Sequence, residues 1–143
     1  YIYGTTGVGK TRQVMEQYGY DKCYRVTDYA HPFDGYKGQD VIIFEEFRNS
    51  LKIADMLVYL DGYPVELPCR YANKQACFTK VYIISNWALE LQYPQIQAET
   101  PLTYQAWLRR IHTVRIFSDD GKYVDSTVQE YFKFKPTSVQ WPS

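Results

Sequence analysis

The spacing of apolar and polar residues predicts a sheet with helices along this chain. Residues 41–44 are all apolar and are followed by two carboxylates, which is typical of a parallel strand buried on both faces. We expect this strand in the centre of the sheet. Further strands are expected at residues 1–3 and 23–27. Apolar residues at helical spacing predict a helix from Lys10 to Tyr18 that stops at Gly19.

The middle of the chain predicts one amphipathic helix and one hairpin. Ser50 is a suitable N-cap for a helix over residues 51–61, whose apolar side chains fall on one stripe. Strands at residues 65–70 and 77–85 are expected to pair as a hairpin with a polar tip at 71–76. We regard the helix as structural.

The last third of the chain predicts a helix followed by a strand. Thr100 and Pro101 form an N-cap and first-turn pair that opens a helix to about residue 110. A strand is expected at 111–117, and the chain after Phe134 is expected to be loosely held. The core candidates on this helix are Leu102, Ala106 and Leu108.

Composition favours one compact, soluble domain. The chain has 143 residues, 45% of them hydrophobic, and we expect residues 1–117 to form the core and 118–143 a C-terminal hairpin and tail. Its 16 basic and 16 acidic residues balance, so any DNA contact must be local. Three cysteines without a C-x-x-C pair favour a reducing compartment. No apolar run reaches the roughly 18 residues of a membrane span, so no membrane partner is expected.

Residues 4–11 match the G-x-x-x-x-G-K-[ST] pattern of a phosphate-binding P-loop. Glycines let successive backbone N–H groups point at phosphate oxygens. Lys10 would place its charge on the β- and γ-phosphates, and the Thr11 hydroxyl would ligate Mg²⁺. The chain should therefore bind a nucleoside triphosphate with Mg²⁺. The nucleotide-binding residues are Gly4, Thr5, Thr6, Gly7, Val8, Gly9, Lys10 and Thr11.

Polar residues follow two of the apolar strands. Glu45 and Glu46 come directly after the strand at 41–44, and alternate strand residues point to opposite faces, so the two need different roles unless the strand has ended. We assign Glu45 to the Mg²⁺ shell, through water, and Glu46 to polarising the attacking water. Asn86 ends the next apolar strand, where its neutral amide can hold that water or contact the γ-phosphate.

The order of these elements resembles the superfamily 3 helicase domain of replication initiator (Rep) proteins from small circular single-stranded DNA viruses and related plasmids. The similarity runs from residue 4 to about residue 110. The chain departs from the family in Glu45-Glu46, where many relatives have aspartates, in Thr11, often Ser, and in lacking a lysine-glycine-glycine at the hairpin. The matching segments are the P-loop, FDGYKGQ at 33–39 leading into VIIFEEF, YPVE at 63–66, YIISN at 82–86 and RRI at 109–111.

The resemblance implies a P-loop NTPase of AAA+-like type, a three-layer α/β domain with a mostly parallel sheet and an inserted β-hairpin. Such domains use ATP and Mg²⁺ and form rings, usually hexamers, that move 3′ to 5′ on single-stranded DNA. The family's pore hairpin implies Lys74 at the tip, with Arg70 as second choice. Tyr71 either stacks on a base or packs the hairpin base, and packing is favoured. The arginine finger, given in trans to the neighbouring subunit, maps onto Arg110, with Arg109 second.

We therefore expect the helicase module of a rolling-circle replication initiator. A nicking endonuclease domain would precede it, because the strand that feeds the P-loop is barely present and the sequence reads as a fragment. The protein would work inside the cell, in the nucleus for a eukaryotic virus or the cytoplasm for a bacterial plasmid or phage. Two alternatives remain, a P-loop kinase acting on a small molecule or nucleotide, and a nucleotide-gated DNA clamp. Glu46 and Asn86 disfavour the kinase, and turnover stimulated by single-stranded DNA separates both from a helicase.

Overall fold

The computed structural model describes residues 1–133 and contains a six-stranded sheet in the order β2-β3-β6-β1-β7-β8. Every neighbouring pair is parallel except β7 and β8. This confirms the expected α/β class with a mostly parallel sheet. The strands are β1 (Ile2–Tyr3), β2 (Cys23–Val26), β3 (Val41–Phe44), β6 (Lys80–Ser85), β7 (Val114–Phe117) and β8 (Tyr123–Ser126).

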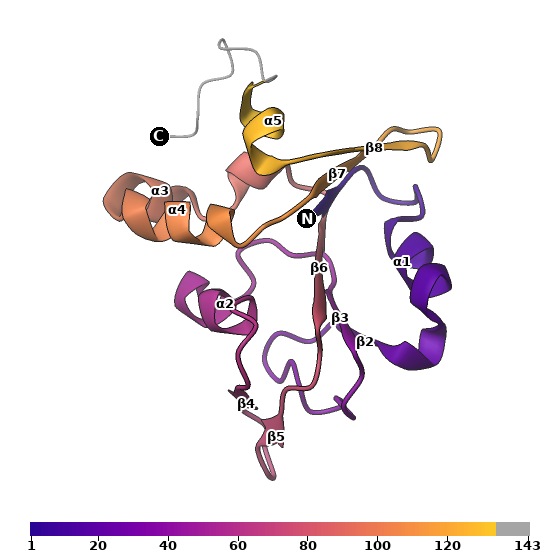
Figure 1. Ribbon diagram of the computed structural model, residues 1–143, viewed down its shortest axis with the longest axis vertical. Coiled ribbons are helices and arrows are strands. Elements are labelled where there is room, and N and C mark those ends of the chain that lie inside the picture. Colours follow the sequence, from indigo (N-terminus) through magenta and orange to yellow (C-terminus); the bar gives the residue numbers. More distant parts are fainter. Residues whose placement is uncertain (134–143) are drawn as a thin grey trace.

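Helices cover both faces of the sheet (Figure 1). One face carries α1 (Lys10–Tyr18), whose Val14 is fully buried, and the other carries α2 (Ile53–Tyr59), α3 (Pro94–Glu99) and α4 (Pro101–Arg109). The short helix α5 (Val128–Lys133) follows β8, and single turns of 3-10 helix occur at η1 (Tyr20–Lys22) and η2 (Leu89–Leu91). No helix among residues 1–133 has both the length and the apolar character that a membrane crossing requires.

The larger core lies on the α2–α4 side and is rich in aromatic rings. Trp107 is fully buried there and meets Tyr93 edge to face, with ring centroids 5.1 Å apart. Val128 and Tyr131 of α5 join the same core, and β8 pairs with β7. Sheet and core therefore continue beyond residue 117. The segment after Phe134, expected to be loosely held, lies outside the described residues.

The helix prediction for α1 is confirmed, with its end at Gly19, and β3 is fully buried between β2 and β6. The middle of the sheet, however, is occupied by β6 and β1. The strand β3 therefore lies one position away from the centre of the sheet, where it was expected.

Two local predictions on the helices are wrong. Ser50 does not cap α2, because its hydroxyl accepts a hydrogen bond from the Arg48 backbone N–H and the helix begins after Lys52. Leu102 is 83% exposed, because the face of α4 turned to the core carries Tyr104, Trp107 and Leu108 instead.

The hairpin forms with a different partner strand from the one expected. β4 (Glu66–Leu67) pairs antiparallel with β5 (Lys74–Gln75), and the later apolar strand β6 joins the central sheet beside β3. An apolar strand gains more from burial between two strands than from a solvent-exposed hairpin. The tip is therefore residues 68–73, and Lys74 lies on a hairpin strand.

Candidate nucleotide-binding site

Parallel strands bring their carboxyl ends to one edge of the sheet, and the candidate residues follow three of these ends. The P-loop follows β1, the two carboxylates follow β3, and Asn86 follows β6. Together they line a cleft of about 290 Å³. The cleft is lined by Thr6, Gly7, Gly9, Lys10, Thr11, Arg12, Glu45, Glu46, Arg48, Ile84, Ser85 and Asn86.

The P-loop has a backbone that only glycine adopts readily. Gly7 and Gly9 have φ angles of 87° and 89°, and no atom outside the neighbouring residues lies within 4 Å of a Cβ built on either. The space beside these two residues is therefore open to a ligand. At Gly4 the constraint is steric, because a Cβ there would come within 2.8 Å of the Phe117 Cβ. The loop thus has the conformation and the clearance that phosphate binding needs.

Lys10 holds its ammonium group inside the loop. Its Nζ donates hydrogen bonds to the carbonyl oxygens of Gly4, at 2.5 Å, and Thr5, at 2.8 Å. Partial burial lowers the pKa of Lys10, and the nearby carboxylates of Glu45 and Glu46 oppose that shift. A cation that has only dipolar partners at the mouth of an anion site is suited to receive a phosphate.

Glu45 joins the P-loop helix to the second strand of the site. Its Oε1 accepts a hydrogen bond of 2.6 Å from the Thr11 hydroxyl, and its Oε2 forms an ion pair of 3.3 Å with Arg25 on β2. The carboxyl group is buried. Hydroxyl and carboxylate oxygens so close together form the hard donor set that Mg²⁺ prefers, so the residues fit this cation.

Glu46 shares the cleft with Glu45 because β3 has ended. The strand stops at Phe44, and Glu46 has a left-handed backbone conformation with φ 46°. This turn removes the alternation of faces that would otherwise separate the two carboxylates. Glu46 is exposed at the cleft wall while Glu45 is buried.

Sequence reasoning missed two arginines at this site. Arg25 holds Glu45, and Arg48 lines the cleft and donates from Nε to the Asn86 Oδ1 at 3.2 Å. Nothing in the spacing of either residue marks it, because Arg25 reaches Glu45 only through the pairing of β2 with β3. Arg48 lies two residues after Glu46, and that closeness in sequence was the one available signal.

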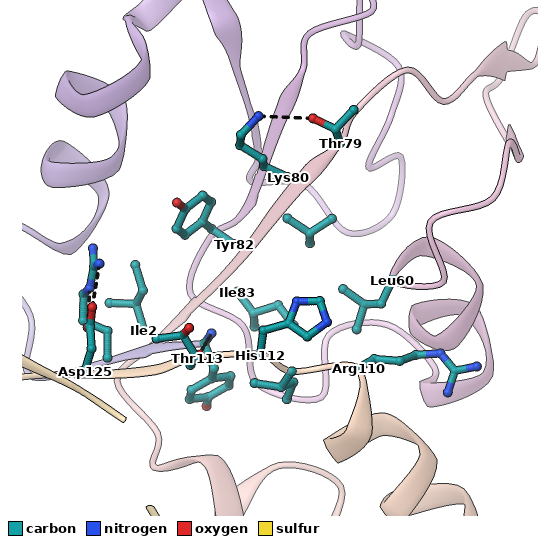
Figure 2. Close-up of a pocket in the computed structure, with 14 residues that line it drawn as sticks. Ile2, Leu60, Thr79, Lys80, Tyr82, Ile83, Arg110, His112, Thr113 and Asp125 are labelled. Carbon is teal, nitrogen blue, oxygen red and sulfur yellow. Dashed lines mark hydrogen bonds and ion pairs between the residues drawn. The ribbon is translucent and has the colours of Figure 1, made fainter. Parts of the chain in front are cut away.

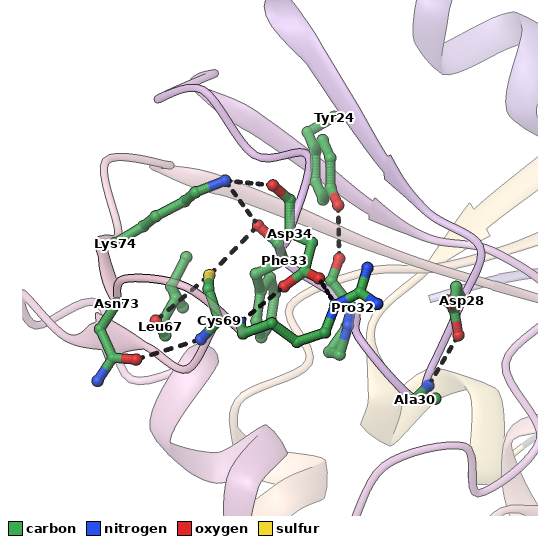
Figure 3. Close-up of polar contacts among 11 residues, drawn as sticks. Tyr24, Asp28, Ala30, Pro32, Phe33, Asp34, Leu67, Cys69, Asn73 and Lys74 are labelled. Atoms are coloured by element: carbon green, nitrogen blue, oxygen red, sulfur yellow. Dashed lines mark hydrogen bonds and ion pairs between the residues drawn. The ribbon is translucent and has the colours of Figure 1, made fainter.

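The hairpin is tied down by contacts with the loop before β3, and Figure 3 shows them. Lys74 Nζ donates to the carbonyl oxygens of Phe33 and Asp34. Arg70 forms an ion pair with the Asp34 carboxylate at 2.5 Å, and its hydrogen bond lowers the pKa of Asp34. Tyr71 is 94% exposed, with the Arg70 guanidinium 5.9 Å from its ring centre. The favoured packing of Tyr71 and the tip position of Lys74 are therefore wrong, because the tip ends one residue earlier and its tyrosine points into solvent.

The two finger candidates lie away from the nucleotide cleft of their own chain. Arg110 forms an ion pair of 3.0 Å with Asp61 at the end of α2 and donates to the Ala106 carbonyl. It lines a second cavity of about 350 Å³, on the opposite side of that cavity from Asp125 (Figure 2). Arg109 is exposed on α4 beside Gln105.

Comparison with known proteins matches this chain to one family. A family model described as RNA helicase matches residues 1–86. The replication-associated protein of beak and feather disease virus is 34% identical over 71% of this chain and 34% of its own length. The corresponding protein of canary circovirus is 33% identical over 64% of this chain and 31% of its own length, and that of goose circovirus is 28% identical over 84% and 39%.

The chain spans about a third of the length of the curated relatives it matches. The matched residues include the P-loop, both carboxylates after β3 and Asn86. The resemblance drawn from the motifs is thereby confirmed, and this chain belongs to the RNA helicase family, as a superfamily 3 P-loop domain related to circovirus replication-associated proteins.

Proposed function

We propose that this chain is the ATP-hydrolysing motor of a replication initiator, which couples hydrolysis to 3′ to 5′ movement along single-stranded DNA. The observation that carries the proposal is the meeting of Lys10, Thr11, Glu45, Glu46 and Asn86 around one cleft. This set combines a phosphate-binding cation, oxygen donors for Mg²⁺ and groups that can orient water, as phosphoryl transfer to water requires.

Four of these five residues have distinct tasks in this proposal. Thr11 and Glu45 hold Mg²⁺, Glu45 through water, and Lys10 leaves its loop carbonyls to contact the β- and γ-phosphates. When bound there, Mg²⁺ would neutralise part of the charge of the phosphates. Glu46, exposed at the cleft wall, accepts a hydrogen bond from the attacking water and polarises it.

The site is completed by a second copy of the chain in a ring, a hexamer by family resemblance. Arg110 is the finger and Arg109 the second choice, because both lie outside the cleft of their own chain, and Arg110 leaves its ion pair with Asp61 to reach a neighbour's cleft. A finger supplied in trans stabilises charge on the transferring phosphoryl group only when the ring is assembled. A single copy then binds nucleotide but hydrolyses it slowly.

The hairpin tip contacts single-stranded DNA in this proposal. Tyr71 is exposed and stacks on a base, and the neighbouring Arg70 adds positive charge near the backbone. Lys74 was the first choice from sequence. Its ammonium is already bonded to Phe33 and Asp34, so we assign it to holding the hairpin in place.

The decisive experiment compares ATP turnover with and without single-stranded DNA, followed by unwinding of duplexes with a 3′ or a 5′ tail. Stimulation by DNA with unwinding from the 3′ tail supports the motor. Turnover that requires a small-molecule acceptor would support a kinase, and DNA binding without turnover would support a clamp.

An upstream nicking endonuclease domain, and action in the nucleus or cytoplasm of a host cell, are part of the same proposal.

A further inference from the structure

Arg48 occupies the nucleotide cleft without having been assigned a role. It belongs to the loop between β3 and α2 and lines the cleft together with the P-loop and both carboxylates. Its Nε donates a hydrogen bond of 3.2 Å to the Asn86 Oδ1. The partner is a neutral amide oxygen, so the contact orients the guanidinium without neutralising its charge.

The backbone on both sides of Arg48 is fixed by buried polar groups. The Phe47 carbonyl accepts hydrogen bonds from the Ser85 hydroxyl, at 2.6 Å, and the Gln92 amide, at 2.8 Å. The Asn49 N–H donates to the Gln92 Oε1 at 2.8 Å. Ser85 and Gln92 are both fully buried. A loop anchored in this way presents the side chain of Arg48 from a rigid base, as a phosphate-contacting group needs.

The guanidinium of Arg48 also lacks a carboxylate partner within residues 1–133. Most other arginines of the described chain have one, at 3.3 Å or less in every case. The exceptions are Arg48 and Arg109, and of these two Arg48 alone lines the cleft. The paired arginines are Arg12, Arg25, Arg70, Arg110 and Arg115.

An arginine stays protonated at any ordinary pH. In an anion-binding cleft, a guanidinium without a carboxylate partner is suited to bind an oxyanion through two parallel hydrogen bonds. Nε is engaged by Asn86, and the structure records no hydrogen bond from the two terminal nitrogens. We propose that Arg48 contacts the terminal phosphate of the nucleoside triphosphate bound to its own subunit, and that Asn86 is the residue that orients it. The inference rests on the proposed nucleotide site. It adds a catalytic residue from the subunit that binds the nucleotide to the arginine finger supplied by the neighbouring subunit.

The test is a comparison of triphosphate and diphosphate binding by the 143-residue chain. For Arg48→Gln we expect the affinity for a non-hydrolysable ATP analogue to fall about tenfold, because a charge-assisted contact is lost, and that for ADP to change by less than about twofold. Arg48→Lys should recover part of the loss, since it keeps the charge but not the fork. Asn86→Leu should lower analogue affinity in the same direction, and Lys37→Gln, a charge removed from an exposed loop outside the cleft, should leave both affinities unchanged.

The outcomes separate this inference from the proposed function. If Arg48→Gln loses equal affinity for the analogue and for ADP, or loses none for either, the proposed role of Arg48 is overturned. The proposed nucleotide site would still stand in that case, provided that the wild type binds nucleotide. Arg48 is exposed, so the melting temperature of Arg48→Gln should match the wild type and exclude a folding defect. Failure of the wild type to bind either nucleotide would overturn the site and this inference together.

Discussion

The Thr11 hydroxyl donates a hydrogen bond of 2.6 Å to the Glu45 carboxylate, although the two residues are 34 positions apart in the sequence. This bond joins the first turn of α1 to the end of β3, and it brings the two oxygen donors expected for Mg²⁺ into contact. Arg25 holds the other oxygen of the same carboxylate. The half of the site proposed to hold Mg²⁺ is therefore assembled by the fold.

Replacing Lys10 tests the phosphate-binding half of the site. Lys10→Ala removes the only lysine that lines the cleft, as far as the described residues go, and should lower ATP turnover by about 100-fold or more. Phosphate release at saturating ATP measures it. Lys37→Ala serves as the control, because this lysine lies in an exposed loop. Undiminished hydrolysis by Lys10→Ala would contradict the proposed role of the P-loop in ATP hydrolysis.

The two carboxylates should differ when each is replaced by its amide. Glu46→Gln should keep nucleotide binding and lose hydrolysis, because it is exposed at the cleft and assigned to the water. Glu45→Gln should weaken the Mg²⁺ dependence of binding and also lower the melting temperature, since it breaks the pair with Arg25. Calorimetric titration with and without Mg²⁺ measures nucleotide binding, phosphate release measures hydrolysis, and thermal denaturation gives the melting temperature. If Glu45→Gln gives binding without hydrolysis and Glu46→Gln does not, the two roles are exchanged.

At the hairpin, Tyr71 should matter more than Lys74 for DNA binding. Tyr71→Ala should weaken binding of single-stranded DNA about five- to tenfold, a loss typical of one stacked base, and leave nucleotide affinity unchanged. Fluorescence anisotropy at low salt measures it, with Tyr20→Ala as a matched control, another exposed tyrosine on the 3-10 turn after α1.

Lys74→Ala supplies the contrasting measurement. The lysine is bonded to two backbone carbonyls, so its loss should lower the thermal stability of the hairpin region while the salt dependence of DNA binding keeps its slope. A shallower slope for Lys74→Ala, with no effect of Tyr71→Ala, would restore the lysine as the DNA contact and remove the tyrosine.

A site shared between subunits, as proposed, predicts complementation between two inactive variants. Lys10→Ala damages the cleft and keeps the proposed finger, whereas Arg110→Ala keeps the cleft and removes the proposed finger. Mixed rings should regain turnover, because a subunit with an intact cleft then receives the finger of a Lys10→Ala neighbour. The mixture should exceed the sum of the separate activities. No gain on mixing would place the finger elsewhere, with Arg109→Ala as the next variant to mix.

The sequence predicted the elements whose signals are local. The glycine spacing of the P-loop and the stop at Gly19 located α1, and the apolar run located β3. The hairpin was mispaired because β6 is apolar enough to suit either a hairpin or a sheet interior, and only the whole sheet decides between them. Leu102 was placed in the core by hydrophobicity alone, although three neighbours on α4 form the better stripe.

The sequence predicted five residues of the candidate site but not the side-chain contacts that hold the site together. Lys10, Thr11, Glu45, Glu46 and Asn86 do meet at one cleft, as their motifs indicated. The contacts of Arg25 with Glu45 and of Arg48 with Asn86 depend on strand pairing and on a loop held by buried side chains. No spacing in the sequence encodes such contacts, so they emerge only in three dimensions.

The most direct measurement is ATP turnover per subunit, followed as protein concentration rises, with and without single-stranded DNA. A site shared between subunits predicts turnover that increases with concentration as rings form, rises further with DNA and is lost in Lys10→Ala. Turnover per subunit that is independent of both concentration and DNA, or that survives in Lys10→Ala, would contradict a DNA-coupled motor.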